Sequence, residues 1–129
     1  MYLLDTNVCL DFAKARSETL RTRVREQGGK GMAISTVTLG ELRLGAQRSD
    51  AAADDERTLT IFVGLLGLRP FDVAAAEAYG RLAGRVKLGR NSFDRLIAAH
   101  ALALEAVLVT NDERDFADIP GLRVENWTR

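Results

Sequence analysis

The sequence predicts an α/β fold in which a parallel sheet of four to five strands is covered by helices on both faces. Short, wholly apolar runs alternate with stretches in which apolar residues recur at helical spacing. Wholly apolar strands are typical of a parallel sheet that is buried on both faces. A chain of 129 residues suits one core, so we expect a single domain over residues 1–129.

The predicted strands are short, and helical segments connect them. Strands are expected at residues 2–4, 32–35, 68–71, 106–110 and 122–124. Arg69 precedes Pro70, which favours extended backbone at the third of these. Helices are expected from about residue 8 to a glycine-containing break at 27–31, over 37–47, from a polar connection at 49–56 up to Gly67, after Asp72, and over 93–105.

Two of the predicted helices show a clear apolar stripe. Asp72 is a suitable N-cap for the first of them. Its expected core face consists of Val73, Ala76, Tyr79, Leu82 and Val86. The second is expected to face inward with Phe93, Leu96, Ile97, Ala101 and Leu104.

The composition narrows the class of protein. Eighteen basic and eighteen acidic residues cancel, whereas proteins that wrap nucleic acid without specificity carry a basic excess. Any nucleic acid must therefore meet a local basic patch or a metal that bridges carboxylates to phosphate. The sequence contains no apolar run of the ~18 residues that a membrane span needs and no secretion signal, so we expect a cytoplasmic protein.

Cysteine and histidine chemistry is nearly excluded. One cysteine and one histidine permit neither an internal disulfide nor a zinc cage. His100 lies about 240° around its helix from Asp94, so the two side chains do not share a face. We expect a packed histidine rather than a general base.

Acidic residues gather at one predicted edge of the sheet. Asp5 ends the first strand, and Asp112 follows the strand at 106–110. Glu41 and Asp94 lie near the starts of their helices. In open α/β sheets, ligands bind beyond the carboxyl ends of the strands, where these residues should meet. Asp5 alone would also suit a strand-end turn.

Carboxylates packed into one cleft repel each other and require a positive partner. Mg²⁺, with Mn²⁺ as a substitute, is the cation that an all-oxygen donor set selects. Such a centre supports phosphodiester hydrolysis, since a bound metal activates water and neutralises charge on the reacting phosphate.

Other readings exist for these acids. Thr38 and Glu41 have the spacing of a capping box, in which Glu41 would bond back to the helix start. Asp94 would also be favourable at a helix N-terminus without any metal. Asp115 competes with Asp112 for the fourth acidic position.

Several segments of the sequence resemble the successive motifs of PIN domains. They are Leu-Leu-Asp-Thr-Asn at 3–7, Ser-Thr-Val-Thr-Leu-Gly-Glu-Leu at 35–42, Phe-Asp-Arg-Leu-Ile-Ala-Ala-His-Ala at 93–101 and Leu-Val-Thr-Asn-Asp at 108–112. The close of the chain, Asp115-Phe116 and Gly-Leu-Arg-Val-Glu-Asn-Trp at 121–127, is similar to the end of VapC-type toxins. The resemblance covers essentially the whole chain.

This resemblance implies a Mg²⁺-dependent endoribonuclease that cleaves a structured RNA such as tRNA or rRNA. It also implies a toxin that a cognate antitoxin neutralises, a homodimer, and a heterotetramer or larger assembly with the antitoxin. Asp5, Glu41 and Asp94 match the three core acids, and Asp112 matches the variable fourth. The positions that orient the acids match Thr6, Asn7 and Thr110, with Asp115 as a further contributor.

A mechanism follows as a hypothesis. Asp5 and Asp94 hold the metal directly, Asp112 holds it directly or through water, and Glu41 completes the shell or positions the attacking water. Basic residues around the approach are expected to meet RNA phosphates: Arg85, Lys87, Arg90 and Arg95. An apolar surplus on the first two helices would form a groove for a partner helix: Val8, Leu10, Phe12, Leu39 and Leu44.

Rival functions remain at this point. A phospho-acceptor receiver domain shares the size and the acids, but it needs an acceptor Asp after its third strand and a Lys after its fifth. Here Asp54 and Asp55 lie in a polar stretch, and no lysine follows Val109. Nearer rivals are a PIN nuclease of RNA maturation, a DNase, or a PIN domain that only binds.

Overall fold

The computed structural model describes residues 1–27, 31–85 and 92–129. The strands are β1 (Tyr2–Leu4), β2 (Met32–Ser35), β3 (Gly67–Arg69), β4 (Val107–Val109) and β5 (Val124–Glu125). The helices are α1 (Thr6–Ala13), α2 (Glu18–Gln27), α3 (Thr36–Gln47), α4 (Ala52–Gly64), α5 (Val73–Ala83), α6 (Ser92–Leu104) and the short 3₁₀ helix η1 (Glu113–Phe116).

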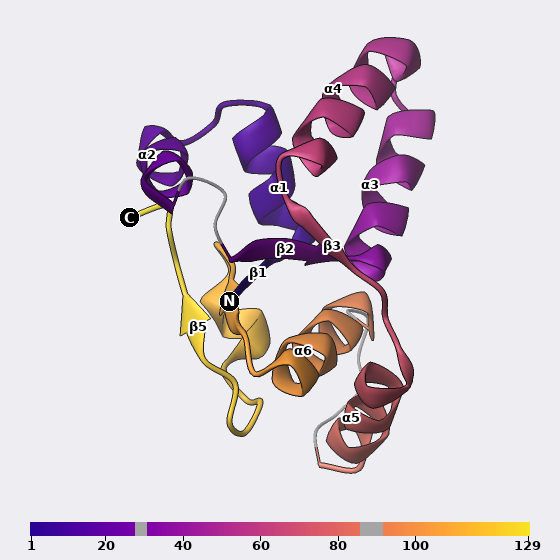
Figure 1. Cartoon of the computed structure of the whole chain (residues 1–129), viewed down its shortest axis with the longest axis vertical. Coiled ribbons are helices and arrows are strands. Elements are labelled where there is room, and N and C mark those ends of the chain that lie inside the picture. Colours follow the sequence, from indigo (N-terminus) through magenta and orange to yellow (C-terminus); the bar gives the residue numbers. More distant parts are fainter. Residues whose placement is uncertain (28–30, 86–91) are drawn as a thin grey trace.

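The strands form one parallel sheet in the order β3-β2-β1-β4-β5. Figure 1 labels β1, β2, β3 and β5. Leu3 of β1 pairs with Ala33 of β2 on one side and with Leu108 of β4 on the other. From β1 the chain first builds outward to β2 and β3, and it later returns to place β4 on the opposite side of β1. The predicted parallel α/β sheet is therefore confirmed, with five strands.

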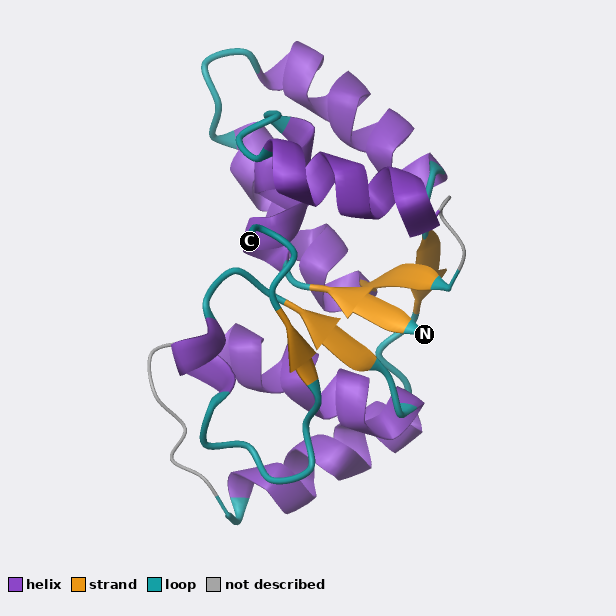
Figure 2. Ribbon diagram, turned by 90° about the vertical axis from the view of Figure 1, so that its left-hand side faces the viewer, coloured by secondary structure: helices purple, strands orange, loops and turns teal. Residues whose placement is uncertain are grey.

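Helices cover both faces of the sheet, as predicted (Figure 2). Successive strand residues point to opposite faces, so Leu3 and Leu4 are both fully buried but belong to different cores. Leu3 packs in the core with α5 and α6. Leu4 packs in the core with α1, α2, α3 and α4. This double burial explains why the strands are uniformly apolar.

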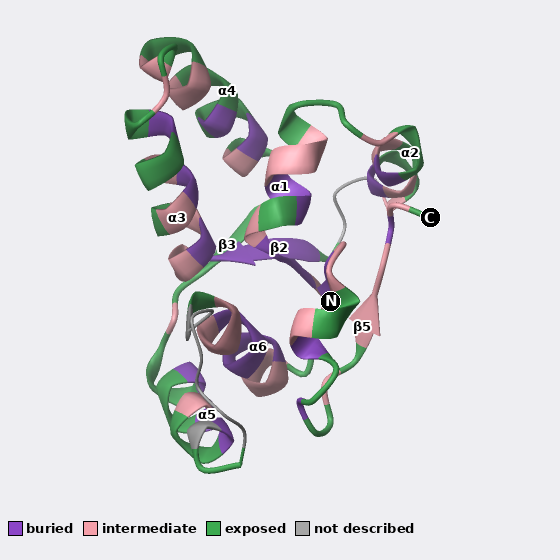
Figure 3. Ribbon diagram, turned by 180° about the vertical axis from the view of Figure 1, so that it is seen from behind, coloured by how far each residue is buried: buried purple, intermediate pink, exposed green. Residues whose placement is uncertain are grey.

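The predicted core faces of α5 and α6 are partly wrong (Figure 3). In α5 the fully buried positions include Ala75, Ala78 and Leu82, whereas Val73 is 73% exposed. In α6 a continuous run from Ile97 to Ala101 is buried, and Phe93 is 54% exposed. Small alanines allow α5, α6 and the sheet to approach closely, so alanine rather than the larger side chain occupies the contact.

The helix boundaries also differ from those expected. The stretch after β1 contains two helices, because α1 ends at Ala13 and α2 begins at Glu18. Helix α4 begins within the polar connection, with Asp54 and Asp55 in its first turn. Acidic side chains are favourable there, since they interact with the positive end of the helix dipole.

The C-terminal segment is attached to α2 and β1. Trp127 is buried and packs edge-on against Tyr2, with ring centroids 5.0 Å apart. The Arg23 guanidinium lies 5.1 Å from the Trp127 ring, and the Trp127 Nε1 donates to Glu125 at 2.9 Å. In the described ranges, no helix is long and apolar enough to cross a membrane.

Candidate metal centre

Asp5 combines a structural role with a place at the carboxyl edge of the sheet. It follows β1 directly and forms the N-cap of α1, where its Oδ1 accepts from the Val8 amide at 2.8 Å. Its backbone amide donates to Val109 of β4 at 3.0 Å. The side chain is only 3% exposed. Capping therefore fixes a buried carboxylate at the end of a central strand.

Thr110 orients this carboxylate from the neighbouring strand. Its hydroxyl donates to the Asp5 Oδ2, and the same Oγ1 accepts from the Asp112 amide at 3.0 Å. Thr110 is fully buried. One threonine thus links the Asp5 carboxylate to the turn that carries Asp112.

These residues lie where the strand order reverses. The chain leaves β1 for β2 on one side and leaves β4 for β5 on the other, so the carboxyl ends of β1 and β4 form the switch point at which open α/β sheets have their ligand crevice. Asp5 and Thr110 follow these two strands and are hydrogen-bonded to each other. Parallel α/β sheets bind ligands at such a point, and the position of Asp5 matches the predicted site.

Glu41 reaches the same edge from α3. The Thr6 hydroxyl donates to the Glu41 Oε1 at 2.8 Å, across 35 residues of sequence. The capping-box alternative is wrong, because the N-cap of α3 is Ser35, whose Oγ accepts from the Val37 amide. Glu41 therefore lies beyond the first turn and is held by Thr6. Thr6 orients Glu41 rather than Asp5, and Asn7 is exposed.

The pKa of Asp94 is raised by desolvation and by four other carboxylates. Asp94 lies half-buried in the first turn of α6. Desolvation raises its pKa to about 6, and four negative charges add to the shift: Asp115, Asp5, Glu41 and Asp112. Because such repulsion weakens with distance, these acids approach Asp94 from the end of β1, from α3 and from the η1 segment.

The pKa of Asp5 is raised as well. Burial raises its pKa to about 6, despite the bonds from Thr110 and Val8 that favour the charged form. Negative charge on Asp11 and Asp112 adds to the rise. A buried carboxylate with like-charged neighbours is unfavourable alone and becomes favourable once a cation is present.

Asp112 and Asp115 are both close to the centre. Asp112 precedes η1 and Asp115 lies within it, with the Asp115 amide donating to the Asp112 carbonyl at 3.3 Å. Desolvation, followed by the charge of Asp112, raises the pKa of Asp115, whereas Arg95 opposes the rise. Either acid is therefore placed to be the fourth member.

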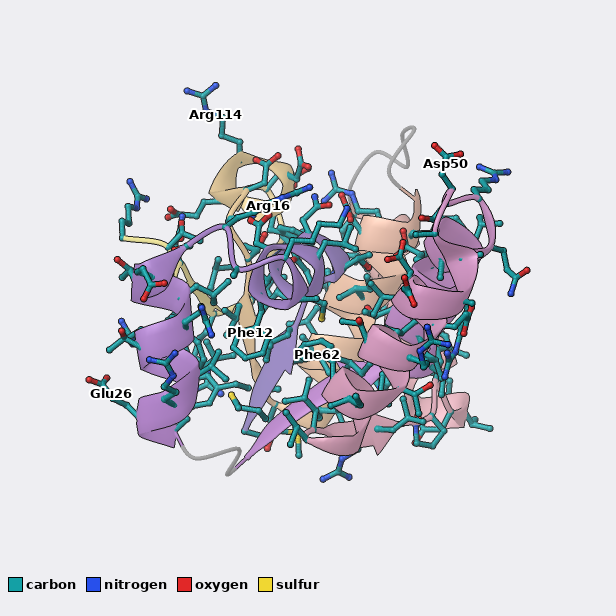
Figure 4. All side chains as sticks on the ribbon, turned by 90° about the horizontal axis from the view of Figure 1, so that it is seen from above. Phe12, Arg16, Glu26, Asp50, Phe62 and Arg114 are labelled. Atoms are coloured by element: carbon teal, nitrogen blue, oxygen red, sulfur yellow. The ribbon has the colours of Figure 1, made fainter. Side chains whose placement is uncertain are left out.

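The sequence interpretation missed Asp11 and Asn111. The Asn111 Nδ2 donates to the Asp11 Oδ2, and the Arg16 Nη1 lies 3.3 Å from the other oxygen of Asp11. Asp11 belongs to α1 and Asn111 follows β4, so only folding brings them together. In Figure 4 the labelled Arg114 side chain projects from the edge of the molecule. The adjacency of Asn111 to Asp112 was the one available signal.

The donor chemistry fits a magnesium centre. Carboxylate oxygen is the donor type that Mg²⁺ prefers, and the thiol of Cys9 is buried in the core with α1 rather than in this crevice. Among the described residues, no three acidic, histidine or cysteine side chains already form a ligand cage. Mg²⁺ needs no such cage, because it usually keeps several waters and binds one or two carboxylates together with substrate phosphate.

The four basic residues predicted to contact RNA do not form one cluster among the described residues. Lys87 and Arg90 lie outside the described residues. Arg85 is exposed just after α5. Arg95 makes a two-point ion pair with Asp118, with N–O distances of 2.8 and 3.1 Å. The only histidine, His100, is 1% exposed and packs against Phe71, as expected for a packed residue.

An apolar groove lies apart from the acids, among α1, α3 and α4. Its volume is about 500 Å³. Apolar side chains from these three helices line it, including Leu10, Leu42, Leu59 and Phe62. Phe12 and Phe62 face each other nearby, with ring centroids 5.2 Å apart (Figure 4). Of the residues predicted to form a partner groove, Leu10 lines this one, whereas Leu44 is 51% exposed in a separate pocket and Val8 is buried in the core.

Comparison with known proteins gives the family of the chain. Residues 2–122 match the family described as PIN domain. The chain belongs to the PIN-domain family. It is 36% identical to the tRNA(fMet)-specific endonuclease VapC of Shigella flexneri over 98% of both chains. It is 32% identical to the ribonuclease VapC2 of Rickettsia felis, over 100% of this chain and 99% of the relative.

Solved structures give the same assignment. A DNA-bound VapBC complex from Salmonella typhimurium contains a chain with a TM-score of 0.90 and 34% identity, over 98% of this chain and 97% of that one. A VapBC2 complex from Rickettsia felis, bound to a promoter DNA fragment, gives 0.89 and 31%, over 98% of both chains. This PIN domain is therefore a nuclease of the VapC family, and the receiver-domain alternative is not supported.

Proposed function

We propose that the chain is a Mg²⁺-dependent endoribonuclease that cleaves structured RNA and acts as the toxin of a toxin–antitoxin pair. The observation that carries the nuclease mechanism is the convergence of carboxylates on Asp94. Desolvation raises its pKa to about 6, and acids from three other segments add to the rise. A polyanionic substrate cannot approach such a cluster unless a cation neutralises it.

Asp5 and Asp94 are the residues that would hold the ion, with Asp112 or Asp115 assisting directly or through water. The bound ion supplies charge neutralisation at the phosphate and a more acidic water. Asp5 is suited to this role because Val8 and Thr110 fix both of its oxygens in orientation. Each oxygen retains a lone pair for a ligand.

Glu41 is the residue that would position the attacking water or accept its proton. The Thr6 hydroxyl occupies one of its oxygens, which leaves the other free to accept a proton or to orient a water. The charge of Glu41 also raises the pKa of Asp94, so the two acids lie within electrostatic range of each other. The water-positioning role is therefore supported by the Thr6 hydrogen bond and by this proximity.

The choice of RNA rests on the relatives. The Shigella relative is named as an endonuclease specific for tRNA(fMet), and the Rickettsia relative as a ribonuclease. A structured RNA such as tRNA or rRNA is accordingly the proposed substrate. Mn²⁺ should replace Mg²⁺, since both cations accept oxygen ligands in octahedral geometry.

The toxin role rests on the relatives and the apolar groove. The similar solved chains come from VapBC toxin–antitoxin complexes. The groove among α1, α3 and α4, about 500 Å³ in volume and lined mainly by apolar side chains, suits an amphipathic antitoxin segment. We accordingly propose a cognate antitoxin as partner, with a homodimer of this chain that forms a heterotetramer or larger assembly when the antitoxin binds.

A cleavage assay on matched nucleic acids tests the nuclease proposal. Purified protein is incubated with a tRNA pool and with single- and double-stranded DNA, in Mg²⁺, Mn²⁺ or EDTA. Cleavage of RNA that EDTA abolishes and either metal restores would support the proposal. Metal-independent cleavage, or cleavage of DNA alone, would overturn it.

The antitoxin proposal has a separate test. The adjacent reading frame is co-expressed with the wild-type chain and with an Ala13→Glu variant, in which an exposed residue of the groove becomes charged. Pull-down of the partner by the wild type but not by the variant, together with inhibited cleavage in the complex, is the expected result. Failure of the wild-type chain to retain any partner would contradict it.

A further inference from the structure

Arg95 of α6 makes a two-point ion pair with Asp118. Its guanidinium nitrogens lie 2.8 and 3.1 Å from the two oxygens of Asp118, which follows η1. The Arg95 side chain is 14% exposed, and that of Asp118 is 54% exposed. The residue next to Asp94 is therefore anchored across 23 positions of sequence.

The location of this pair matters more than its energy. Exposed ion pairs contribute about 0–1 kcal/mol to stability, and apolar packing of Phe116 and Ile119 in the same core as α6 already holds η1 in place. A planar fork bound at two points adds orientation, which a single charge contact does not. The pair acts at the end of α6 where Asp94 lies.

We propose that Arg95 is a positioning residue of the nuclease site, acting through its ion pair with Asp118. The pair fixes the first turn of α6, and therefore Asp94, relative to the η1 segment. That segment carries Asp115, so the pair sets the separation between acids from two different elements. This inference rests on the proposed metal-dependent function, because the positioned acids are those that would hold the ion.

The two-point geometry of the pair also bears on the alternative role of Arg95 as a direct RNA contact. An arginine engaged at two points has little freedom to follow a moving RNA phosphate, which argues against the alternative of a direct RNA contact.

The two roles predict opposite results for Asp118→Asn. If Arg95 positions Asp94, then Asp118→Asn should reproduce the defect of Arg95→Gln. If Arg95 instead binds RNA, Asp118→Asn should release it and leave cleavage unchanged or improved. Arg95→Lys should be intermediate, because lysine keeps the charge but loses the two-point geometry.

The test measures Mn²⁺ binding by electron paramagnetic resonance, and kcat and KM for RNA, on the full chain. Arg57→Gln and Asp54→Asn are the matched controls, because Arg57 and Asp54 form an exposed ion pair within α4. Circular dichroism and Tm establish that each variant is folded; if Arg95→Gln is not, Asp118→Asn decides the outcome.

We expect both Arg95→Gln and Asp118→Asn to weaken Mn²⁺ binding or lower kcat by about 10- to 100-fold. KM for RNA should stay near the wild-type value, and the α4 controls should match the wild type. Wild-type behaviour of Asp118→Asn would overturn the inference, as would a change in KM alone for Arg95→Gln. A wild-type protein without metal-dependent cleavage would instead overturn the proposed function, and the inference with it.

Discussion

The Thr110 hydroxyl donates a hydrogen bond to the Asp5 carboxylate, and this bond joins the ends of two neighbouring parallel strands. The same oxygen accepts from the Asp112 amide at 3.0 Å. Both side chains of the first bond are buried. The orientation of the most buried acid in the centre therefore depends on a neutral residue of the adjacent strand.

Replacing Thr110 with valine should damage both the fold and the site. The change keeps the shape but removes the donor to Asp5 and the acceptor for Asp112. Loss of a bond to a charged group costs about 1.5–3 kcal/mol, so we expect the free energy of unfolding at pH 8 to fall by about that amount. The pKa of Asp5 should rise further, since a bond that favoured the charged form is gone. Urea unfolding and an RNA cleavage assay measure the two effects.

Thr110→Ser is the control for this change. Serine retains the hydroxyl, so it should keep most of the cleavage activity that valine loses. Equal losses for serine and valine would show that the methyl group, and not the hydrogen bond, matters at this position.

Asp5→Asn should stabilise the metal-free protein at high pH. Burial raises the pKa of Asp5 from 3.8 to about 6, so the folded state binds its proton more tightly than the unfolded state does. The wild type therefore loses stability as pH rises from about 4 to above 6, by up to about 3 kcal/mol. Asparagine is a good N-cap and does not ionise.

Urea titrations in EDTA check this difference. At pH 8 the asparagine variant should unfold at a higher urea concentration than the wild type, and near pH 4 the two should converge. Mg²⁺ should raise the stability of the wild type only. A variant that is less stable than the metal-free wild type at pH 8 would contradict the assignment of an unfavourable buried charge.

Metal binding should weaken as pH falls through 6. Both Asp5 and Asp94 have a pKa raised to about 6, and a carboxylate must lose its proton to bind the ion. The apparent Kd for Mg²⁺ should therefore increase steeply from pH 7 to pH 5, with proton release on binding. Calorimetry in buffers of different ionisation enthalpy measures both quantities. An affinity that is constant over this range would exclude these two acids as ligands.

Glu41 should matter for catalysis and not for the start of α3. Glu41→Gln should lower cleavage strongly, because an amide cannot accept a proton from water. Thr6→Val should lower it less, since it frees Glu41 without removing the charge. Neither change should destabilise α3 as Ser35→Ala does, for which loss of the N-cap costs about 1 kcal/mol. Cleavage rates and Tm for the three variants separate a catalytic role from a capping role. If Glu41→Gln lowered Tm as much as Ser35→Ala does, the capping interpretation would be restored.

The central strands and Asp5 could be predicted from sequence because the signals are local. An apolar run that ends in an acid fixes both the strand and the position of the carboxylate at its carboxyl end. The register of Leu3 with Leu108 then brings Thr110 beside Asp5 without further information. The family motifs supplied the remaining acids.

Contacts between distant segments could not be predicted. The interaction of Asn111 with Asp11 joins residues 100 positions apart, and Asp11 belongs to none of the motifs. Glu41 had a local partner in the capping box, but the helix begins three residues earlier than that motif requires. The buried face of a helix could not be predicted from the size of its apolar side chains, since Val73 is exposed and Ala75 is buried.

The most direct test of the acidic centre is the rate of RNA cleavage at saturating Mg²⁺ for the wild type, Asp5→Asn and Asp54→Asn. Asp54 lies exposed on α4, where it pairs with Arg57, and serves as the charge-matched control. We predict wild-type cleavage for Asp54→Asn and loss of cleavage for Asp5→Asn, with all three proteins folded. A folded Asp5→Asn protein that cleaves RNA at the wild-type rate would contradict the assignment of Asp5 to a magnesium centre.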